Sequence, residues 1–207
     1  AGALDALGEA APAVAGRRCL DAGASTGGFT DVLLRRGAGH VVAVDVGYGQ
    51  IAWRLREDPR VTVLERTNVR TLDPAAVAPA PGLVVGDLSF ISLTLVIPSL
   101  VRAAAAEADF LLLVKPQFEV GRERLGAGGV VRDTRLHAET VMAVSACARS
   151  HGLDVLAAIA SPLPGPAGNV EYFLHMRAGS GQEPDGGLES AVRSAIATGP
   201  AGKEARK

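Results

Sequence analysis

Short apolar runs alternate with longer stretches of helical periodicity along most of this chain. Seven runs predict strands, at 17–23, 40–47, 61–67, 82–90, 109–116, 154–163 and 170–178. Four stretches predict helices between them, at 27–37, 49–58, 92–108 and 134–152. Strands that alternate with helices are typical of an α/β fold. The pattern therefore predicts a doubly wound, mainly parallel sheet.

Two places depart from simple alternation. The runs 154–163 and 170–178 have no helix between them, so they are expected to pair as an antiparallel hairpin at one edge of the sheet. Pro98 lies inside the predicted helix 92–108. Because proline lacks a backbone N–H, it is expected to kink this helix or to end it early.

The chain of 207 residues is long enough for one sizeable domain. With 48% hydrophobic but only 4% aromatic residues, its core is expected to be aliphatic. After residue 178 the composition shifts to Gly, Ser, Pro and charged residues. We therefore expect one folded domain over 1–178 and a disordered tail over 179–207, with at best a loose helix at 187–197.

Composition and charge argue against several classes of protein. Two cysteines, Cys19 and Cys147, do not form a disulfide framework and fit a reducing cytosol, so a cytoplasmic protein is expected. No apolar run is long enough to cross a bilayer and no signal peptide is recognisable, so no membrane partner is expected. The net charge of −1 gives no sign of the basic excess that nucleic-acid binding normally needs. The sequence begins with Ala1 rather than methionine, and we expect a segment to precede it.

A glycine-rich turn, "DAGASTGGF", joins the first predicted strand to the first helix. Gly23, Gly27 and Gly28 let the backbone approach a ligand closely, and the helix start offers free N–H groups. Ser25 stands where the second glycine of a dinucleotide-binding G-x-G-x-x-G would be, which disfavours a pyrophosphate. Asp21, just before the turn, suits a cationic or hydroxylated ligand, unless it merely caps the helix.

Polar side chains end most of the predicted strands, at the edge where open parallel sheets bind ligands. In strand order these are Asp21, Asp45, Thr67, Asn68, Asp87 and Lys115. Asp45 is placed to accept hydrogen bonds from ribose hydroxyls. Glu171 begins the last strand, which runs the other way, so it reaches the same edge as Asp87 and Lys115. The sequence thus predicts a proton-handling site next to a nucleoside pocket.

Each of these three residues also has a purely structural explanation. Asp87 would serve as a helix N-cap, and Lys115 would extend its ammonium to solvent. Glu171 would be a charge that protects an edge strand. Any one of these explanations is simpler than catalysis, but none accounts for all three residues at one edge.

The remaining candidates are weaker. No histidine has metal-ligand spacing with another ligand, so no metal site is predicted from His40, His137, His151 or His175. Trp53 is expected to pack on the second helix rather than stack on a base. The best basic patch consists of Arg122, Arg124, Arg132 and Arg135. These arginines would meet phosphates or simply form a solvated loop.

Seven segments, in order from about residue 18 to 177, carry a resemblance to a known family. They are "DAGASTGGF", "DVGYGQ", "RTN", "DLSFISL", "LVKPQFEVG", "GGVVRD" and "SPLPGPAGNVEYF". Together they resemble the TlyA family of ribosomal RNA 2′-O-methyltransferases, also labelled hemolysin-like and related to the FtsJ-type enzymes. The resemblance implies a class I, Rossmann-like fold that uses S-adenosylmethionine, with a seven-stranded sheet and an antiparallel last strand.

The resemblance also implies where the cofactor binds. The glycine turn would hold the methionine and ribose parts, Asp45 the ribose hydroxyls, and the segment 67–69 the adenine. The full implied set is Asp21, Gly23, Ala24, Ser25, Thr26, Gly27, Gly28, Phe29, Asp45, Val46, Thr67, Asn68, Val69 and Asp87.

The implied reaction is methylation of a ribose 2′-oxygen, of cytidine, in 16S or 23S ribosomal RNA or both. Such families use a Lys-Asp-Lys-Glu tetrad, of which Asp87, Lys115 and Glu171 match three members. Lys115 would activate the hydroxyl, either as a neutral base or as a charged stabiliser, while the carboxylates orient it. The family's first lysine, in an S-R-G-A-x-K-L segment upstream of "GALDAL", and its S4-type RNA-binding domain are not in this sequence. We therefore expect the chain alone to bind the cofactor but to methylate ribosomal subunits poorly.

Two rival functions remain at this stage. A nicotinamide-dependent oxidoreductase would use a similar sheet, but the glycine spacing and the antiparallel last strand count against it. A non-enzymatic hemolysin, as the older family label suggests, would need a membrane-active segment that the sequence does not offer. The sequence leaves the oligomeric state open.

Overall fold

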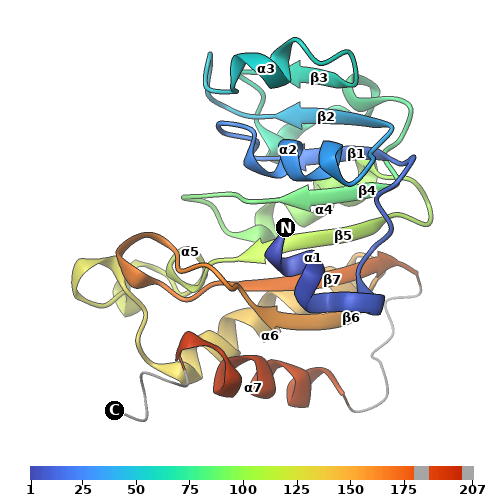
Figure 1. The fold of residues 1–207 in the computed structure, drawn as a ribbon. Helices are drawn as coiled ribbons and strands as arrows, with labels where there is room; N and C mark the ends of the chain where they lie inside the picture. The colour runs from blue at the N-terminus through green and yellow to red at the C-terminus, as the bar shows by residue number, and fades with distance from the viewer. Residues whose placement is uncertain (180–186, 202–207) are drawn as a thin grey trace.

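The computed structural model describes residues 1–179 and 187–201, and its centre is one sheet of seven strands (Figure 1). The strand order is β3-β2-β1-β4-β5-β7-β6. The strands are β1 (Arg18–Ala22), β2 (His40–Val44), β3 (Val61–Leu64), β4 (Leu83–Gly86), β5 (Asp109–Val114), β6 (Leu153–Ala160) and β7 (Tyr172–Ala178). The first five strands pair in parallel, so the predicted α/β sheet is confirmed.

The last two strands form the predicted antiparallel hairpin, but β7 is not at the edge of the sheet. It lies between β5 and β6 and is antiparallel to both. Its first five residues are all buried, whereas β6 is only partly covered and forms the edge. Glu171, directly before β7, is therefore not an edge-strand charge, and that structural explanation is wrong.

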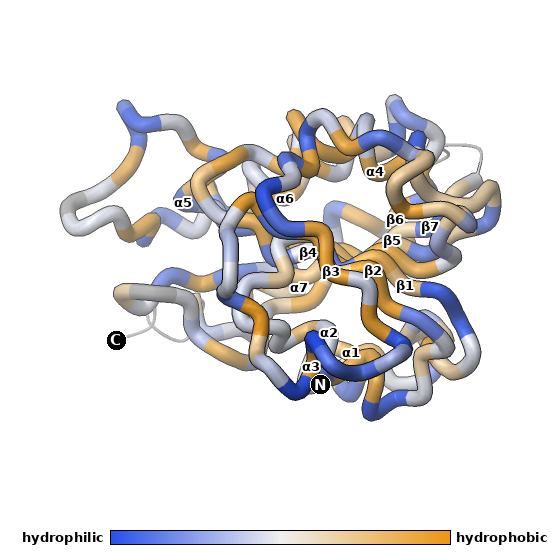
Figure 2. The backbone as a smooth tube through the Cα atoms, turned by 90° about the horizontal axis from the view of Figure 1, so that it is seen from above, coloured by the Kyte–Doolittle hydropathy of each residue, from blue (hydrophilic) through white to orange (hydrophobic). Residues whose placement is uncertain are grey.

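Helices cover both faces of the sheet (Figures 1 and 2). One face carries α1 (Gly2–Leu7), α2 (Gly28–Arg35) and α3 (Trp53–Arg56), whose leucines pack on alternate residues of β1, β2 and β5. The other face carries α4 (Ile97–Ala103), α6 (Thr134–Ser150) and α7 (Leu188–Thr198). The short α5 (Pro116–Glu119) follows β5 directly. Figure 2 shows the strands in the middle of the molecule as the most hydrophobic part of the chain.

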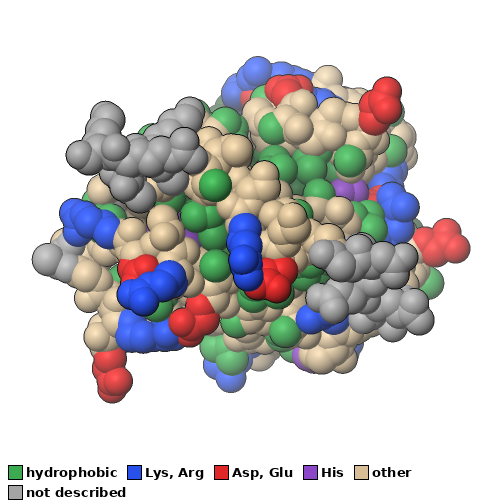
Figure 3. All heavy atoms as spheres, turned by 90° about the horizontal axis from the view of Figure 1, so that it is seen from below, with side chains coloured by type: hydrophobic (Ala, Val, Ile, Leu, Met, Phe, Trp, Pro, Cys, Tyr) green, Lys and Arg blue, Asp and Glu red, His purple; other side chains and the backbone are tan. Residues whose placement is uncertain are grey.

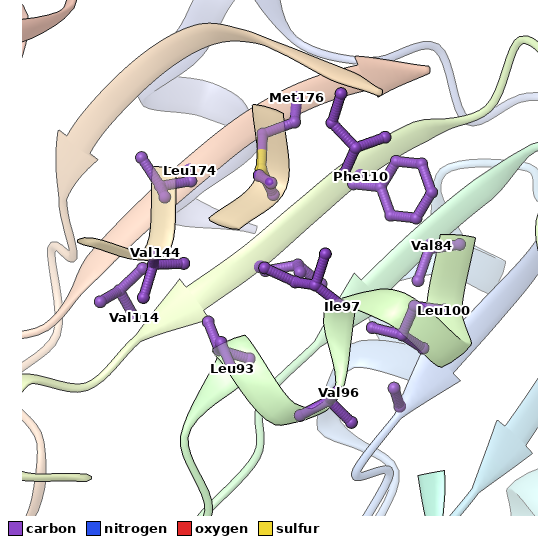
Figure 4. Packing of buried hydrophobic residues seen from close by; sticks show 14 of the residues in the cluster. Val84, Leu93, Val96, Ile97, Leu100, Phe110, Val114, Val144, Leu174 and Met176 are labelled. Atoms are coloured by element: carbon purple, nitrogen blue, oxygen red, sulfur yellow. The ribbon is translucent and has the colours of Figure 1, made fainter. Parts of the chain in front are cut away.

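The core beneath α4 is almost entirely aliphatic, as the composition predicts. Figure 4 shows Ile97 and Leu100 of α4 near Phe110 of β5 and Val84 of β4, and it shows Val114 of β5 beside Val144 of α6. Each such buried side chain contributes about 2 kcal/mol to folding. This packing holds β5 between its neighbouring strands. It therefore also fixes the position of Lys115, which follows Val114.

Some helices differ from the prediction. The stretch 92–108 forms a 3-10 turn at Leu93–Leu95 and then α4, which has Pro98 in its first turn, where its missing N–H costs nothing. The predicted helix 49–58 is reduced to α3. The helix α1 was not predicted at all.

The predicted disordered tail is wrong for part of its length. The helix α7 contacts β6 and α6 and buries Leu188, Val192, Ala195 and Ile196. These four residues lie on one face of the helix. Their burial against the sheet stabilises a helix that the composition of this segment does not by itself predict. The rest of the predicted tail, 180–186 and 202–207, lies outside the described residues. In the part of the chain that is described, no helix is long and apolar enough to span a bilayer.

Candidate active site

Lys115 follows the last residue of β5 and is held against Asp87, which follows β4. The two strands are parallel neighbours in register, so their carboxyl ends deliver both side chains to one place. The Lys115 Nζ lies 2.5 Å from Asp87 Oδ1 and donates a hydrogen bond of 3.0 Å to Ser89 Oγ. Lys115 is only 8% exposed, so the explanation that its ammonium extends to solvent is wrong.

Glu171 joins this pair from β7, as predicted. Tyr172 is the register partner of Val114, which places Glu171 beside Lys115 at the same edge of the sheet. Burial raises the pKa of the Glu171 carboxyl and the Asp87 charge adds to the increase, while Gln117 and Lys115 oppose it. Asp87, Lys115 and Glu171 all line one cavity of about 380 Å³. Most of its other walls are apolar side chains of α1, α2, β5 and β7.

The glycine turn comes close to Asp87 on the other side. Gly23 has φ +81°, and a Cβ there would lie 2.6 Å from the Asp87 carbonyl oxygen, so only glycine fits. The turn and the start of α2 line a cavity of about 290 Å³ that also reaches Asp87 and Lys115. Its predicted residues are Gly23, Ala24, Ser25, Thr26, Gly28 and Phe29.

Asp45 ends β2 at the mouth of a third cavity, of about 420 Å³. Its two carboxylate oxygens accept hydrogen bonds from the backbone N–H groups of Ser25 (2.8 Å) and Gly47 (2.7 Å). Val46, Asn68 and Val69 line the same cavity, together with Asp87. Asp87 thus lines all three cavities, and we refer to these neighbouring cavities together as the trough.

Three of the predicted cofactor residues make contacts within the protein, and their part in cofactor binding stays a prediction. Asp21 is fully buried beneath the turn, where the Thr30 hydroxyl donates to it at 2.7 Å. Burial raises the pKa of Asp21 to about 6, and the Asp87 and Asp45 charges contribute. The Thr67 hydroxyl donates to the Glu65 carbonyl, and Gly27 is the left-handed residue just before α2, packed against Leu55. None of the three lines any of these three cavities.

An aromatic pair next to Lys115 was missed by the sequence reasoning. Phe90 is 89% exposed and has φ +65°, which is unusual for a bulky residue. Its ring centroid lies 5.0 Å from that of Phe118, and Lys115 Nζ lies 6.0 Å from the Phe118 centroid. Both phenylalanines lie in segments that carry the family resemblance, "DLSFISL" and "LVKPQFEVG", and this was the signal that could have found them.

The other candidates lie away from the trough or form ordinary contacts. Trp53 is 72% exposed, so the prediction that it packs is wrong. His137 bonds Tyr172 and the Val131 carbonyl, and His175 bonds Asp109. No group of three His, Cys, Asp or Glu side chains within 1–179 and 187–201 has the geometry for a metal ion.

The predicted basic patch is partly neutralised. Arg124 pairs with Glu139 at 2.5 Å, and Arg135 pairs with Asp133 at 2.9 Å. Arg122 and Arg132 are exposed. Figure 3 shows Lys and Arg side chains next to Asp and Glu on the face seen from below, rather than a patch of one sign.

The sequence of this chain is similar to those of known methyltransferases. The sequence profile of the FtsJ-like methyltransferases matches residues 4–178. The "16S/23S rRNA (cytidine-2′-O)-methyltransferase TlyA" of Mycobacterium tuberculosis is 60% identical over 96% of this chain and 74% of its own length. "Hemolysin A" of Brachyspira hyodysenteriae is 37% identical over 76% of this chain and 66% of its own.

Solved structures agree with the fold. The one described as "Putative hemolysin from Streptococcus thermophilus" superposes with a TM-score of 0.90 at 37% identity, covering 98% of this chain and 72% of its own. An S-adenosylmethionine-dependent methyltransferase from Mesorhizobium loti has a TM-score of 0.59 at 16% identity, over 85% of this chain and 96% of its own. At that identity the likeness shows the fold alone.

Proposed function

This chain belongs to the FtsJ-like methyltransferase family, and we propose that it catalyses transfer of a methyl group from S-adenosylmethionine to the 2′-oxygen of a cytidine in 16S or 23S ribosomal RNA, or both. The observation that carries this proposal is Lys115, buried between Asp87 and Glu171 at the end of a trough lined by the glycine turn. Such an enzyme works on ribosomal RNA or ribosomal subunits in the cytoplasm. The names of two relatives, both rRNA (cytidine-2′-O)-methyltransferases, support this substrate.

We infer that S-adenosylmethionine binds in the trough. Asp45, Asn68 and Val69 would hold the adenosine, and the turn from Gly23 to Phe29 would hold the methionine part. Because Gly23 has no side chain and lies close to Asp87, the backbone of Gly23 would face the ligand. The acidic side chains around the trough suit a cation, and an NAD pyrophosphate would meet repulsion there. When bound, the cofactor supplies an activated methyl group on a sulfonium.

The chain's own residues then act on the attacking hydroxyl. A ribose 2′-hydroxyl is a poor nucleophile because it loses its proton only at high pH. The Lys115 ammonium would lie beside this oxygen and would stabilise the negative charge that develops on it as its proton is lost to solvent. Asp87 holds the ammonium in place through the 2.5 Å ion pair, and Glu171 supplies a second negative charge on the side of β7. The protein therefore contributes alignment and electrostatic stabilisation.

Phe90 provides a surface for the base of the target nucleotide. Its exposed ring contacts that of Phe118, and the Phe118 centroid lies 6.0 Å from Lys115 Nζ. Aromatic rings commonly stack on bases that are lifted out of an RNA strand. A ribose that reaches Lys115 has its base close enough to use this ring.

The rival functions gain no support. The matching family profile is that of FtsJ-like methyltransferases, which disfavours a nicotinamide-dependent oxidoreductase. A relative bears the name "Hemolysin A", but no feature of the described residues favours lysis over methyl transfer.

The test is to map the product. Protein that contains this chain would be incubated with isotope-labelled S-adenosylmethionine and separate small and large ribosomal subunits that lack the modification. Nuclease digestion and mass spectrometry then identify the labelled nucleoside. We expect 2′-O-methylcytidine at one position per labelled RNA. Label on a base atom, or on a nucleoside other than cytidine, would contradict the proposal.

A further inference from the structure

Gln117 lies in the short helix α5, two residues after Lys115, and its side chain contacts Glu171. Its Nε2 donates a hydrogen bond of 3.0 Å to Glu171 Oε1, and the two residues are 9% and 5% exposed. Pro116 starts α5 directly after Lys115, with its fixed backbone angle at the first helical position. Gln117 is therefore fixed relative to Lys115 by the shape of the chain.

Packing alone does not account for a glutamine at this position. Its Oε1 is buried and has no hydrogen-bond partner among the described residues. A buried amide group without a partner costs free energy, whereas an apolar side chain of the same size would not. The bond to Glu171 is thus the interaction that sets Gln117 apart from a leucine or methionine.

The oxygen that Gln117 contacts is also confined from the opposite direction. A Cβ on Gly165 would lie 2.5 Å from Glu171 Oε1, so the carboxylate rests directly on the backbone of the loop before β7. Gln117 and Gly165 together leave Glu171 little freedom to turn away from Lys115.

An amide suits a carboxyl group that changes its protonation state. It donates an N–H to a carboxylate and, after a half-turn of the amide, accepts the O–H of a carboxylic acid. Burial raises the pKa of Glu171, so its protonated form persists to higher pH than that of a free glutamate. Gln117 offers a partner to both forms, which neither lysine nor leucine would do.

Resting on the methyl-transfer function proposed above, we propose that Gln117 is a positioning residue that holds the Glu171 carboxyl beside Lys115 in both protonation states. It acts on the reaction through Glu171 and does not itself touch the reacting atoms.

The first test is a titration that does not depend on activity. The full chain would be labelled with ¹³C at the glutamate side-chain carboxyls, and the Glu171 signal assigned with Glu171→Gln. We expect Gln117→Leu to raise the pKa of Glu171 by roughly one unit, because the donor to the charged form is lost. Gln117→Met, of similar length, serves as a second variant if the first unfolds. Ser145→Ala, which removes a buried hydrogen bond in α6, is the control and should leave this pKa unchanged.

The second test is methyl transfer by the protein that contains this chain. We expect Gln117→Leu to lower kcat roughly tenfold with KM for RNA nearly unchanged, and to move the acidic limb of the kcat–pH profile upward with the Glu171 pKa. An unchanged Glu171 pKa in both variants would overturn the inference, as would a shifted pKa with unchanged kcat and pH profile. Absence of methyl transfer by the wild-type protein would refute the proposed function instead, and the titration alone would then decide whether Gln117 controls Glu171.

Discussion

Lys115 and Asp87 meet as an ion pair of 2.5 Å although 28 positions separate their numbers, because each directly follows a strand and the two strands are parallel neighbours. The pair is built into the sheet rather than into a mobile loop. Rigid placement of this kind is what electrostatic stabilisation of a developing charge requires. Catalysis at this site therefore depends on the geometry of the Lys115–Asp87 pair.

Asp45 should control cofactor affinity. Asp45→Ala removes a carboxylate that lines the adenosine end of the trough and also releases the N–H groups of Ser25 and Gly47. We expect the Kd for S-adenosylmethionine to rise roughly 10- to 100-fold, as measured by calorimetry. Asp73→Asn, at a helical cap away from the trough, is the control. Equal affinity in wild type and Asp45→Ala would mean that the cofactor binds elsewhere.

Asp21 should make stability depend on pH. Its pKa is about 6 in the folded chain against 3.8 for the free side chain, so the folded state binds more protons between these values. Stability contributed by the protonated carboxyl is therefore present below about pH 4 and lost as the pH rises through about 6, by up to about 3 kcal/mol.

Urea unfolding as a function of pH checks this. Asp21→Asn mimics the protonated carboxyl, so its stability relative to wild type should increase as the pH rises through this window. A difference between the two proteins that stays constant across the window would show that Asp21 does not titrate there.

Phe90 should affect methyl transfer to RNA. Phe90→Ala removes the exposed ring, and stacking on an aromatic side chain is worth about 1–3 kcal/mol per base. We expect KM for ribosomal RNA to rise or kcat to fall by roughly tenfold, while Phe90→Tyr retains activity. If Phe90→Ala matches wild type on RNA, the base does not use this ring.

The prediction that the chain alone methylates ribosomal subunits poorly remains open. It follows from the family resemblance, which places a further lysine and an RNA-binding domain before "GALDAL". Methyl incorporation by the 207-residue chain and by a longer protein with these parts, compared on the same subunits, would decide it. Equal rates would contradict the prediction.

Much of the site was predictable because parallel strands impose it. The apolar runs before Asp45, Asp87 and Lys115 are buried on both faces, so their ends and their shared edge follow from sequence alone. The turn before α2 was equally clear, because glycines there permit an approach that a Cβ would block.

What could not be predicted depends on contacts between distant segments. The place of β7 inside the sheet is set by its pairing with β5, which local periodicity does not reveal. The helix α7 gains its stability from β6 and α6, so composition alone suggested disorder. Gln117 looked like an ordinary polar residue after a strand, because its partner Glu171 is 54 positions away.

The central claim is that Lys115 activates the ribose hydroxyl, and Lys115→Ala tests it most directly. Single-turnover methyl transfer to ribosomal RNA would be compared for wild type, Lys115→Ala and the control Arg102→Ala, an exposed residue at the end of α4. The account predicts that Lys115→Ala slows transfer at least roughly 100-fold while the Kd for S-adenosylmethionine changes little, and that Arg102→Ala matches wild type. Normal turnover by Lys115→Ala would contradict the account.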